Sequence, residues 1–417
     1  MTTDPDILVI GAGAAGLAAA RAVLAAGRSV LVLEARGRVG GRVVTDNRLG
    51  APVDLGAAWL HNAEENPLVA LAQQAGVTLV ESDALRQERT LVGDRPATDA
   101  ERAAYDAAWD DFAARTAARA AAGGADCSVA EAAPKGGPWD ATVAAWQGDI
   151  IAGAPLDRIS LQDFAAIALN GSNRLPEQGF GTLLDRLARG LPIRLSAPVT
   201  RLFWGGDQAV AEGDFGSLRA AAVIVTVPTP LLATGALRFD PPLPPEVLQA
   251  AHDLPLGAVA KVVFRGTDRL GLPPFASVDR RIAPGETLVA MSARPFGRDI
   301  LACHVGGDAA AALEAEGDAA LEAFMRAEIA RRYGVAASAM LRPDPIVTGW
   351  RRDPFARGAY SNARIGRAAA RGILAAPLAG GRLCLAGEAC HARLAGTVAG
   401  AWRSGEAAAR AALAALR

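Results

Sequence analysis

The sequence predicts an α/β fold in which a buried parallel sheet begins with the first residues of the chain. Residues 6–10 and 29–33 are short apolar runs, as is typical of strands covered on both faces. A glycine-rich turn at 11–16 follows the first run, and 17–26 then have the composition of a helix that ends at Gly27. Strand, turn, helix and second strand in this order indicate a βαβ unit.

The turn has the spacing G-x-G-x-x-G, which in this context is a fingerprint for dinucleotide binding. Gly11 permits the tight turn, Gly13 lets a pyrophosphate approach the backbone, and Gly16 lets the helix pack closely on the strand. At Ala14 and Ala15 the helix offers free N–H groups and the positive end of its dipole to phosphate. The alternative is an ordinary turn in an Ala- and Gly-rich chain, which does not account for the strands on both sides.

An acidic residue ends the second strand. Glu34 follows Gly16 at nearly the spacing of about 20 residues that is expected for an acid binding ribose hydroxyls. Its charge disfavours the 2′-phosphate of NADP. NAD and FAD therefore remain as candidate cofactors.

The residues that follow favour FAD. Residues 34–42 resemble the E-A-R-x-R-x-G-G-R run of the flavin-containing amine oxidase superfamily, which includes monoamine, polyamine and L-amino-acid oxidases. The resemblance implies that FAD is contacted by Ala35, Arg36, Gly40, Gly41 and Arg42, the last three along its diphosphate. Paired glycines for close approach and a guanidinium for phosphate oxygens agree with this assignment.

Three further segments resemble the same superfamily. Residues 53–61 are similar to the V-D-L-G-A-x-W-I-H pattern of polyamine oxidases, and 386–388 and 396–401 to the closing A-G-E and G-T-V-x-G-A patterns. The resemblance implies additional FAD contacts at Gly56, Ala57, Ala58, Trp59, Val199, Trp350, Gly387, Glu388, Thr397 and Val398. The N-terminus of the last helix, near Thr397, would stabilise the negative charge of reduced flavin.

The pattern of segments predicts two domains. A discontinuous Rossmann-type FAD-binding domain would comprise residues 1–84, 176–236 and 347–417, and an α+β substrate-binding domain would comprise 85–175 and 237–346. Residues 85–175 are expected to be a helical insertion. Helices are expected over 100–122, 139–151, 161–169 and 318–333, and strands over 198–202, 258–264, 287–291 and 300–305.

Composition excludes several functional classes. The formal net charge of the 417 residues is −1, so a nucleic-acid partner is not expected. The four cysteines include no C-x-x-C pair and are expected to be free thiols, and no metal site is expected. Neither a signal peptide nor an apolar run long enough to span a bilayer is visible, so we expect a cytoplasmic protein, monomeric or homodimeric, without a membrane partner.

Lys261 is the first candidate catalytic residue. It interrupts an apolar strand at 259–264, and a buried ammonium is costly unless it has a partner or loses its proton. A lysine on the solvent face of a strand is the alternative. The segment resembles the lysine strand of the superfamily, which implies that Lys261 holds a water at flavin N5 and supports reoxidation by oxygen.

Tyr360 is the second candidate. The segments at Trp350 and Tyr360 resemble the W-x-x-D-P and G-x-Y-S patterns of the superfamily, which implies that Tyr360 is one wall of an aromatic cage for the amine. Thr397 stands where monoamine oxidases have the second tyrosine. Ala359 stands where they carry the cysteine attached to FAD, so we expect non-covalent FAD.

The remaining candidates concern the substrate. The resemblance places His61 near the substrate channel, although a surface or capping histidine is the alternative. Glu64 and Glu65 are candidates for binding a distal ammonium. L-amino-acid oxidases of the superfamily usually carry an arginine soon after this Gly-Ala pair to hold the substrate carboxylate. Ala58 and Trp59 follow Gly56-Ala57 here, which favours an amine substrate over an amino acid.

The sequence therefore predicts an FAD-dependent amine oxidase acting on a polyamine or another small amine. The amine would pass a hydride to flavin N5 and become an imine that hydrolyses to a carbonyl, while O2 would reoxidise the flavin to give H2O2. The alternatives are an L-amino-acid oxidase, a desaturase or dehydrogenase of the same superfamily, and a flavin-binding interaction protein without turnover.

Overall fold

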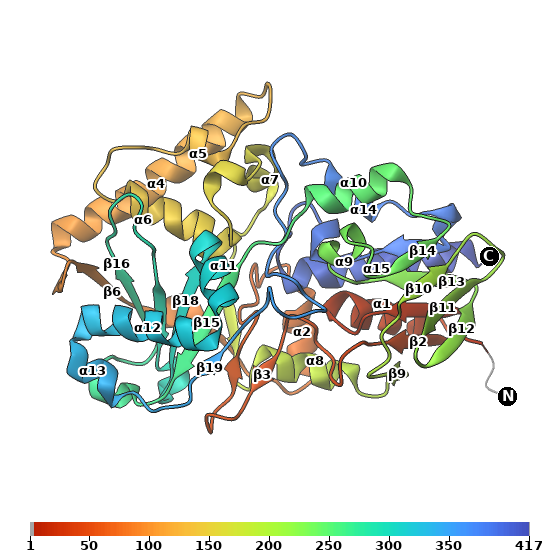
Figure 1. Cartoon of the computed structure of the whole chain (residues 1–417), viewed down its shortest axis with the longest axis horizontal. Coiled ribbons are helices and arrows are strands. Elements are labelled where there is room, and N and C mark those ends of the chain that lie inside the picture. The colour runs from red at the N-terminus through yellow and green to blue at the C-terminus, as the bar shows by residue number, and fades with distance from the viewer. Residues whose placement is uncertain (1–3, 417) are drawn as a thin grey trace.

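The computed structural model describes residues 4–416, apart from the side chains of residues 268 and 269. One half of the molecule is built on a parallel sheet and the other half on a larger, mostly antiparallel sheet, the right and left halves of Figure 1. In residues 4–416, no helix is both long and apolar enough to cross a bilayer. All four cysteines are free.

The parallel sheet has five strands in the order β20-β13-β1-β2-β9. Its strands are β20 (Leu383–Leu385), β13 (Ala222–Val225), β1 (Ile7–Ile10), β2 (Val30–Leu33) and β9 (Ile193–Arg194). The central strand pairs Ile7 with Val30 on one side and with Ala222 on the other. Strands from four distant parts of the chain thus meet in one sheet.

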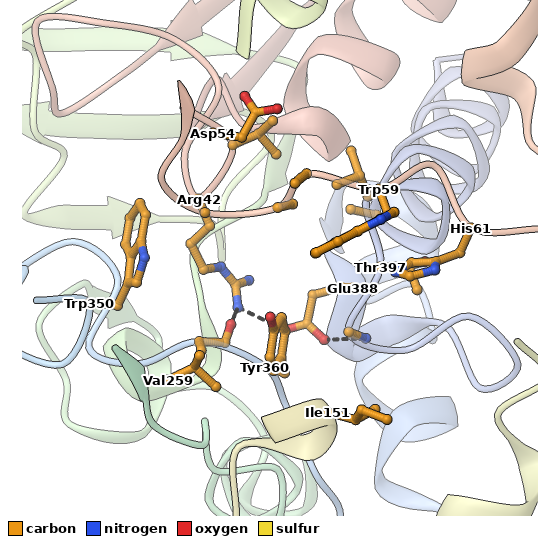
Figure 2. Close-up of a pocket in the computed structure, with 18 of the residues that line it drawn as sticks. Arg42, Asp54, Trp59, His61, Ile151, Val259, Trp350, Tyr360, Glu388 and Thr397 are labelled. Carbon is orange, nitrogen blue, oxygen red and sulfur yellow. Dashed lines mark hydrogen bonds and ion pairs between the residues drawn. The ribbon is translucent and has the colours of Figure 1, made fainter. Parts of the chain in front are cut away.

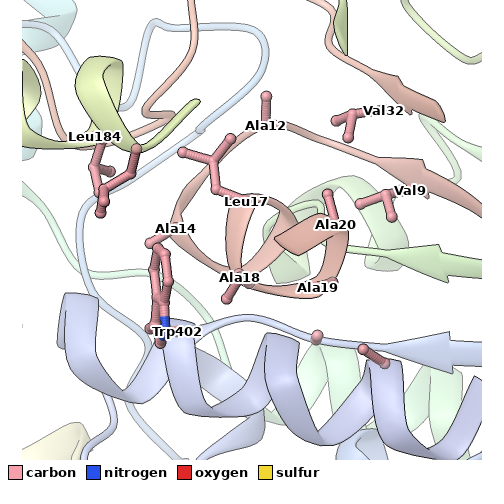
Figure 3. Packing of buried hydrophobic residues seen from close by; sticks show 14 of the residues in the cluster. Val9, Ala12, Ala14, Leu17, Ala18, Ala19, Ala20, Val32, Leu184 and Trp402 are labelled. Atoms are coloured by element: carbon pink, nitrogen blue, oxygen red, sulfur yellow. The ribbon is translucent and has the colours of Figure 1, made fainter. Parts of the chain in front are cut away.

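The face of this sheet shown in Figure 3 is covered by two helices, α1 (Ala14–Ala25) and α15 (Val398–Ala415). Small residues allow these helices to come close, because a Cβ on Gly405 would lie 2.0 Å from the Ala15 carbonyl oxygen. Trp402 and Leu17 are fully covered in the same cluster. The packing fixes the N-termini of both helices relative to the sheet.

A four-stranded sheet with the order β12-β11-β10-β14 adjoins this half. Its strands are β10 (Arg201–Phe203), β11 (Ala209–Gly213), β12 (Gly216–Ala220) and β14 (Arg238–Asp240). The expected strand over 198–202 is therefore displaced, because Pro198 and Val199 leave the sheet and line the cavity described below. Proline offers no N–H to a ladder, which is consistent with its position outside the strand.

The second half contains a seven-stranded sheet with the order β19-β15-β18-β17-β16-β6-β7. Its strands are β19 (Ile346–Val347), β15 (Val259–Phe264), β18 (Leu301–Gly306), β17 (Ala290–Ala293), β16 (Ala276–Arg280), β6 (Gln87–Val92) and β7 (Arg95–Pro96). One face packs against α11 (Gly307–Glu316) and α12 (Asp318–Tyr333). The other face is turned to the cavity.

The expectation that residues 85–175 form only a helical insertion is wrong at its start. Residues 87–92 form β6, which pairs in parallel with β16 through registers such as Ser277 with Glu88. The first residues of β6 are exposed and charged, so the sequence lacks the apolar signal of a sheet strand. The division of the chain into two domains stays a prediction.

The helices of that segment lie between residues 82 and 166. The segment contains α4 (Asp99–Ala121), α5 (Val129–Ala132), α6 (Asp140–Ala145), the π-helix η1 (Trp146–Ala152), the 3₁₀ turn η2 (Leu156–Arg158) and α7 (Leu161–Ala166). Thr98 and Glu101 begin α4 with a capping box. The helix expected over 139–151 changes to π geometry at Trp146, and the one expected over 161–169 ends at Ala166.

Shorter elements complete the fold. The helices are α2 (Pro67–Gln74), α3 (Ser82–Leu85), α8 (Phe180–Ala188), α9 (Thr229–Ala233), α10 (Pro245–Asp253), α13 (Val335–Met340) and α14 (Ala370–Ala375). Two small antiparallel pairs are β3 (Thr45–Asp46) with β4 (Val53–Asp54) and β5 (Leu79–Glu81) with β8 (Arg174–Pro176). The 3₁₀ turns are η3 (Thr267–Leu270), η4 (Pro295–Gly297), η5 (Ala379–Gly381) and η6 (Glu388–Cys390).

Candidate active site

A cavity of about 1670 Å³ runs from the parallel sheet to the seven-stranded sheet. Its first part lies at the carboxyl ends of β1, β2 and β13, where open α/β sheets bind ligands. Pockets for a single drug-sized ligand measure roughly 300–1,000 Å³. The cavity is therefore large enough for a dinucleotide and a second small molecule.

The structure brings nearly all the predicted site residues to this cavity. They are Gly11, Gly13, Ala14, Ala15, Glu34, Ala35, Arg36, Gly40, Gly41, Arg42, Gly56, Ala57, Ala58, Trp59, His61, Val199, Lys261, Trp350, Tyr360, Gly387, Glu388, Thr397 and Val398. Among the predicted FAD-binding and catalytic residues, the exception is Gly16, which does not line the cavity. A Cβ there would lie 1.8 Å from the Gly11 carbonyl oxygen, so Gly16 serves helix–strand packing.

The turn between β1 and α1 leaves open space beside its backbone. A Cβ on Gly13 would meet no heavy atom within 4 Å, and Gly13 lines the cavity. The first intrahelical bond of α1 runs from the Leu17 N–H to the Gly13 carbonyl oxygen, so the preceding N–H groups have no partner within the helix. This cradle fits the diphosphate of a dinucleotide.

Glu34 is fixed where β2 ends. Its carboxylate accepts hydrogen bonds from the backbone N–H of Ala12 at 2.7 Å and of Arg36 at 2.8 Å, and the residue is buried. The Arg36 guanidinium pairs with Asp353 at 2.5 Å and lies over the Phe355 ring. A carboxylate still has free lone pairs after two such bonds and can accept from ribose hydroxyls.

Arg42 and Glu388 form an ion pair inside the cavity wall, at 3.0 Å (Figure 2). Arg42 also donates to the Ala359 carbonyl oxygen, and Glu388 accepts from the Gly396 N–H at 2.9 Å. Burial opposes ionisation of Glu388, but Arg42 and the Ser361 hydroxyl bring the pKa of its carboxyl below the usual value. The carboxylate thus links the 34–42 segment to the turn before α15.

Lys261 is almost fully buried in the wall formed by β15. Its Nζ donates to the carbonyl oxygens of Asp54 at 2.5 Å and Gly56 at 3.4 Å. Burial lowers the pKa of Lys261 to about 8, although the Asp54 carboxylate opposes the shift. The solvent-face alternative for Lys261 is therefore wrong, since the amine lies inside the protein at the cavity.

Tyr360, Thr397, Trp59 and His61 surround a neighbouring part of the cavity. Figure 2 shows Trp59, His61 and Thr397 together on one side of the view, with Trp350 on the other and Tyr360 between. Thr397 caps α15 by accepting from the Gly400 N–H at 2.9 Å. His61 shares a hydrogen bond of 2.7 Å with Asn173, and burial lowers the pKa of its ring.

The helical segment and the seven-stranded sheet enclose the far part of the cavity, which we call the substrate chamber. Its lining includes Trp109, Ala113 and Ala117, which repeat every four residues on one face of α4, together with Trp146 and Ile150 of η1. Alternate residues of the sheet strands supply the opposite wall.

Sequence reasoning missed several polar residues of this wall, and the two that matter most here are His304 and Asp279. His304 pairs directly with Lys261 across β15 and β18, and burial lowers the pKa of its ring to about 3. Burial raises the pKa of Asp279 to about 6, and its Oδ1 has no hydrogen-bond partner among the described residues. A polar residue inside an apolar strand, the signal that identified Lys261, is present at both positions.

The glutamates proposed for a distal ammonium lie elsewhere. Glu64 accepts hydrogen bonds from the backbone and hydroxyl of Ser172, and neither Glu64 nor Glu65 lines the cavity. The structure therefore gives no support to these two candidates.

The polar groups of the first part of the cavity suit FAD. They are the open backbone at Gly13, the buried acid at Glu34 and a second helix N-terminus at Val398. Positive helix ends stabilise a diphosphate and a negatively charged reduced flavin. Lys261 and Tyr360 line the same cavity, and Lys261 belongs to the sheet that also forms a wall of the substrate chamber.

Comparison with known proteins identifies relatives over most of the chain. The model of the family described as "Flavin containing amine oxidoreductase" matches residues 14–136 and 157–413. Polyamine oxidase 4 of Oryza sativa subsp. japonica is 30% identical, with 98% of this chain and 88% of the relative covered. Lysine-specific histone demethylase 1B of Mus musculus is 29% identical over 96% of this chain, which spans about half (52%) of the relative.

A solved structure has the same fold. Wild-type putrescine oxidase bound to putrescine aligns with a TM-score of 0.81 at 23% identity, covering 99% of this chain and all of that chain.

Proposed function

Because the chain belongs to the flavin-containing amine oxidoreductase family and uses FAD, we propose that it oxidises a small amine bound in the substrate chamber, with O2 as electron acceptor. The observation that carries the proposal is the buried Lys261, whose amine lies at the cavity between the predicted FAD residues and the chamber. A dinucleotide-binding protein without turnover has no need for a buried amine at this place.

The predicted FAD residues divide into groups with distinct roles. The Gly13 turn and the Gly40–Arg42 segment hold the diphosphate, Glu34 holds ribose hydroxyls, and the backbone at Val199 meets the adenine. The segments Gly56–Trp59 and Gly387–Glu388, with Trp350, Thr397 and Val398, enclose the remainder. Ala359 offers no group for covalent attachment, so FAD is bound non-covalently.

When bound, FAD accepts a hydride equivalent from the carbon next to the amine nitrogen and is reoxidised by O2 to give H2O2. The protein holds the amine against Tyr360 and excludes water from the chamber. Lys261, fixed through the carbonyl oxygens of Asp54 and Gly56, positions a water for the reoxidation step. The imine product hydrolyses to a carbonyl.

The far wall of the chamber favours an amine with a second positive charge. Asp279 presents a carboxylate whose Oδ1 has no hydrogen-bond partner within residues 4–416, and the Tyr105 hydroxyl is 3.5 Å from its Oδ2. Glu88 lines the same wall, whereas the guanidinium groups of Arg332, the larger influence, and of Arg86 partly offset the negative charge. We therefore place a diamine or polyamine ahead of a monoamine, with its reacting nitrogen at Tyr360 and its distal ammonium toward Asp279.

The experiment is a visible spectrum of the purified protein, followed by anaerobic addition of putrescine, spermidine, n-butylamine and L-leucine. We expect flavin absorbance bands that putrescine or spermidine bleaches, and H2O2 on admission of air. Absence of flavin, or flavin that none of the amines bleaches, would contradict the proposal. Bleaching by L-leucine alone would make the protein an amino-acid oxidase, and bleaching without H2O2 a dehydrogenase.

A further inference from the structure

A buried ion pair joins the helical segment beside the substrate chamber to the region around Glu388. Asp163 of α7 and Arg371 of α14 make a two-pronged contact, with Nε–Oδ1 and Nη2–Oδ2 distances of 2.6 and 2.8 Å. Both residues are almost completely buried, at 2% and 1% exposure. Such a pair contributes little net stability, because desolvation offsets the attraction, so its geometry is the more informative property.

Arg371 uses all five of its N–H donors. Besides the two bonds to Asp163, Nη1 donates to the Ser361 hydroxyl at 2.8 Å and to the Ala389 carbonyl oxygen at 3.3 Å. Nη2 donates to the Ser361 carbonyl oxygen at 3.0 Å. A guanidinium with five donors in a rigid fork is thereby held in one orientation.

The fixed Arg371 guanidinium orients the hydroxyl of Ser361. Its hydroxyl accepts from Arg371 and therefore directs its single hydrogen to Glu388 Oε2, 2.6 Å away. The same oxygen accepts from the Gly396 N–H, and Oε1 pairs with Arg42. A continuous chain of hydrogen bonds thus runs from α7 to Arg42 and to the turn that precedes α15.

Both ends of this chain of hydrogen bonds lie at the cavity. Phe164, the neighbour of Asp163 on α7, lines the substrate chamber, and Ile167 and Ala168 beyond the helix do so as well. At the other end, Arg42, Gly396 and Thr397 line the part assigned to FAD. Charge-assisted hydrogen bonds are stronger than neutral ones and keep this path stiff.

We propose that Asp163 and Arg371 are positioning residues that act through Ser361 and Glu388 on the FAD site and couple it to the wall of the substrate chamber. The inference rests on the proposed function, since it requires FAD at Arg42 and Gly396. It assigns a role in cofactor positioning to two residues outside the predicted FAD-binding motifs. Both act on Glu388 through the Ser361 hydroxyl, and Arg371 also acts on it through its charge. A shift of α7 on amine binding would reach the flavin along this path.

The test is a double-mutant cycle on the FAD-loaded protein. Asp163→Asn removes the charge of the first carboxylate, and Ser361→Ala removes the hydroxyl in the middle while keeping the ion pair. The readouts are the rate of FAD release on dilution, followed by flavin fluorescence, and the flavin midpoint potential. Asp308→Asn is the matched control, because Asp308 makes a similar two-pronged pair with Arg158 on the surface.

Each single variant is expected to release FAD about tenfold faster, as for the loss of one charge-assisted hydrogen bond. It is also expected to move the midpoint potential of the flavin by about 30 mV, the shift for a tenfold larger loss of affinity in one redox state than in the other. In the double variant, the rate of FAD release and the shift in midpoint potential should be little larger than in the more affected single variant. Both substitutions interrupt the same path of hydrogen bonds, so their effects should not add. Asp308→Asn should match the wild type in both readouts.

Additive effects in the double variant, or single variants indistinguishable from Asp308→Asn, would overturn the proposal. If Asp163→Asn does not give folded protein, Ser361→Ala alone decides through the midpoint potential, which a loss of stability does not move. These outcomes are separate from those for the proposed function. If an amine bleaches the flavin but the two substitutions have additive effects, the proposed function stands and the positioning role of Asp163 and Arg371 is refuted.

Discussion

Lys261 and His304 lie directly opposite each other on antiparallel strands β15 and β18, and both line the cavity. Burial lowers the pKa of both groups, to about 8 for the ammonium and about 3 for the imidazole, and Lys261 adds to the shift of His304. At neutral pH the pair therefore carries one positive charge, on Lys261. The histidine is a neutral hydrogen-bonding group in the same wall.

Replacing Lys261 by Met should slow reoxidation of the reduced flavin by about 100-fold, the lower end of the range for a positioned side chain that assists proton transfer. Anaerobic reduction by the amine should change by less than about threefold, because Lys261 acts in the other half-reaction. Stopped-flow mixing of reduced enzyme with O2 measures the first rate. Lys135→Met is the control, since Lys135 is the other lysine of the chain and is exposed; equal reoxidation rates in both variants would refute the role.

Stability should depend on pH through the same residue. The folded-state pKa of Lys261 is about 8, below the ordinary value of 10.5, so between these values the unfolded chain binds more protons and stability rises with pH. The stability of wild type relative to Lys261→Met should thus increase from pH 8 to 10.5, by at most about 3 kcal/mol, and stay flat below pH 8. Thermal midpoints of both proteins across this range give the comparison. A constant difference would mean that the ammonium is not destabilised by burial.

The ring of Tyr360 should matter more than its hydroxyl. Tyr360→Ala removes an aromatic wall and should lower kcat/KM by about 2- to 13-fold or more, the equivalent of an aromatic contact. Tyr360→Phe keeps the ring and should stay within about twofold of wild type. Steady-state kinetics with the amine that bleaches the flavin make the test, and similar losses in both variants would shift the role to the hydroxyl.

Asp279 should determine the preference for a second charge. Asp279→Asn should lower kcat/KM for putrescine by about tenfold or more while leaving n-butylamine nearly unchanged, because only the diamine places an ammonium at the far wall. The wild-type preference should fade as pH falls below about 6, where the carboxyl becomes protonated. Equal losses for both amines would exclude a distal-ammonium role.

A methyl group at Gly13 should weaken FAD binding without harming the fold. The added Cβ would project into open space, and its φ of −73° is ordinary for alanine. We expect Gly13→Ala to release FAD at least tenfold faster, because the methyl would occupy the place of the diphosphate. Gly372→Ala is the control, since its Cβ also meets nothing within 4 Å but lies away from the cavity. Equal rates of FAD release from both variants would show that the diphosphate does not bind at this turn.

Elements of the fold could be predicted where the local sequence pattern is strong. The bounds of α12 agree with the expected 318–333, since an amphipathic helix flanked by two glycines is readable from sequence. Strand β6 was missed because its first three residues, 87–89, are polar or charged and its partner, β16, is remote in the chain. The π-helix η1 contacts η2 and β18, and no sequence pattern distinguishes it from an α-helix.

The site residues likewise divide into those that a local sequence pattern reveals and those that only the tertiary structure reveals. The glycine turn, Glu34, the 40–42 segment and Lys261 are found from motifs or from a charge in an apolar run. The Asp163–Arg371 pair joins residues 208 positions apart, and neither residue stands in a motif. Asp279 and His304 were readable in principle, but only the register of the seven-stranded sheet shows that they share a face with Lys261.

The layout of the parallel sheet has a consequence for biosynthesis. Strand β1 is made first, yet its sheet is completed by β20 and its helix α1 is covered by α15, which are made last. A nascent chain must therefore keep the apolar face of α1 from aggregating until more than 370 further residues have been translated. We expect the five-stranded parallel sheet to be completed only once α15 has been translated, with the seven-stranded sheet able to form earlier.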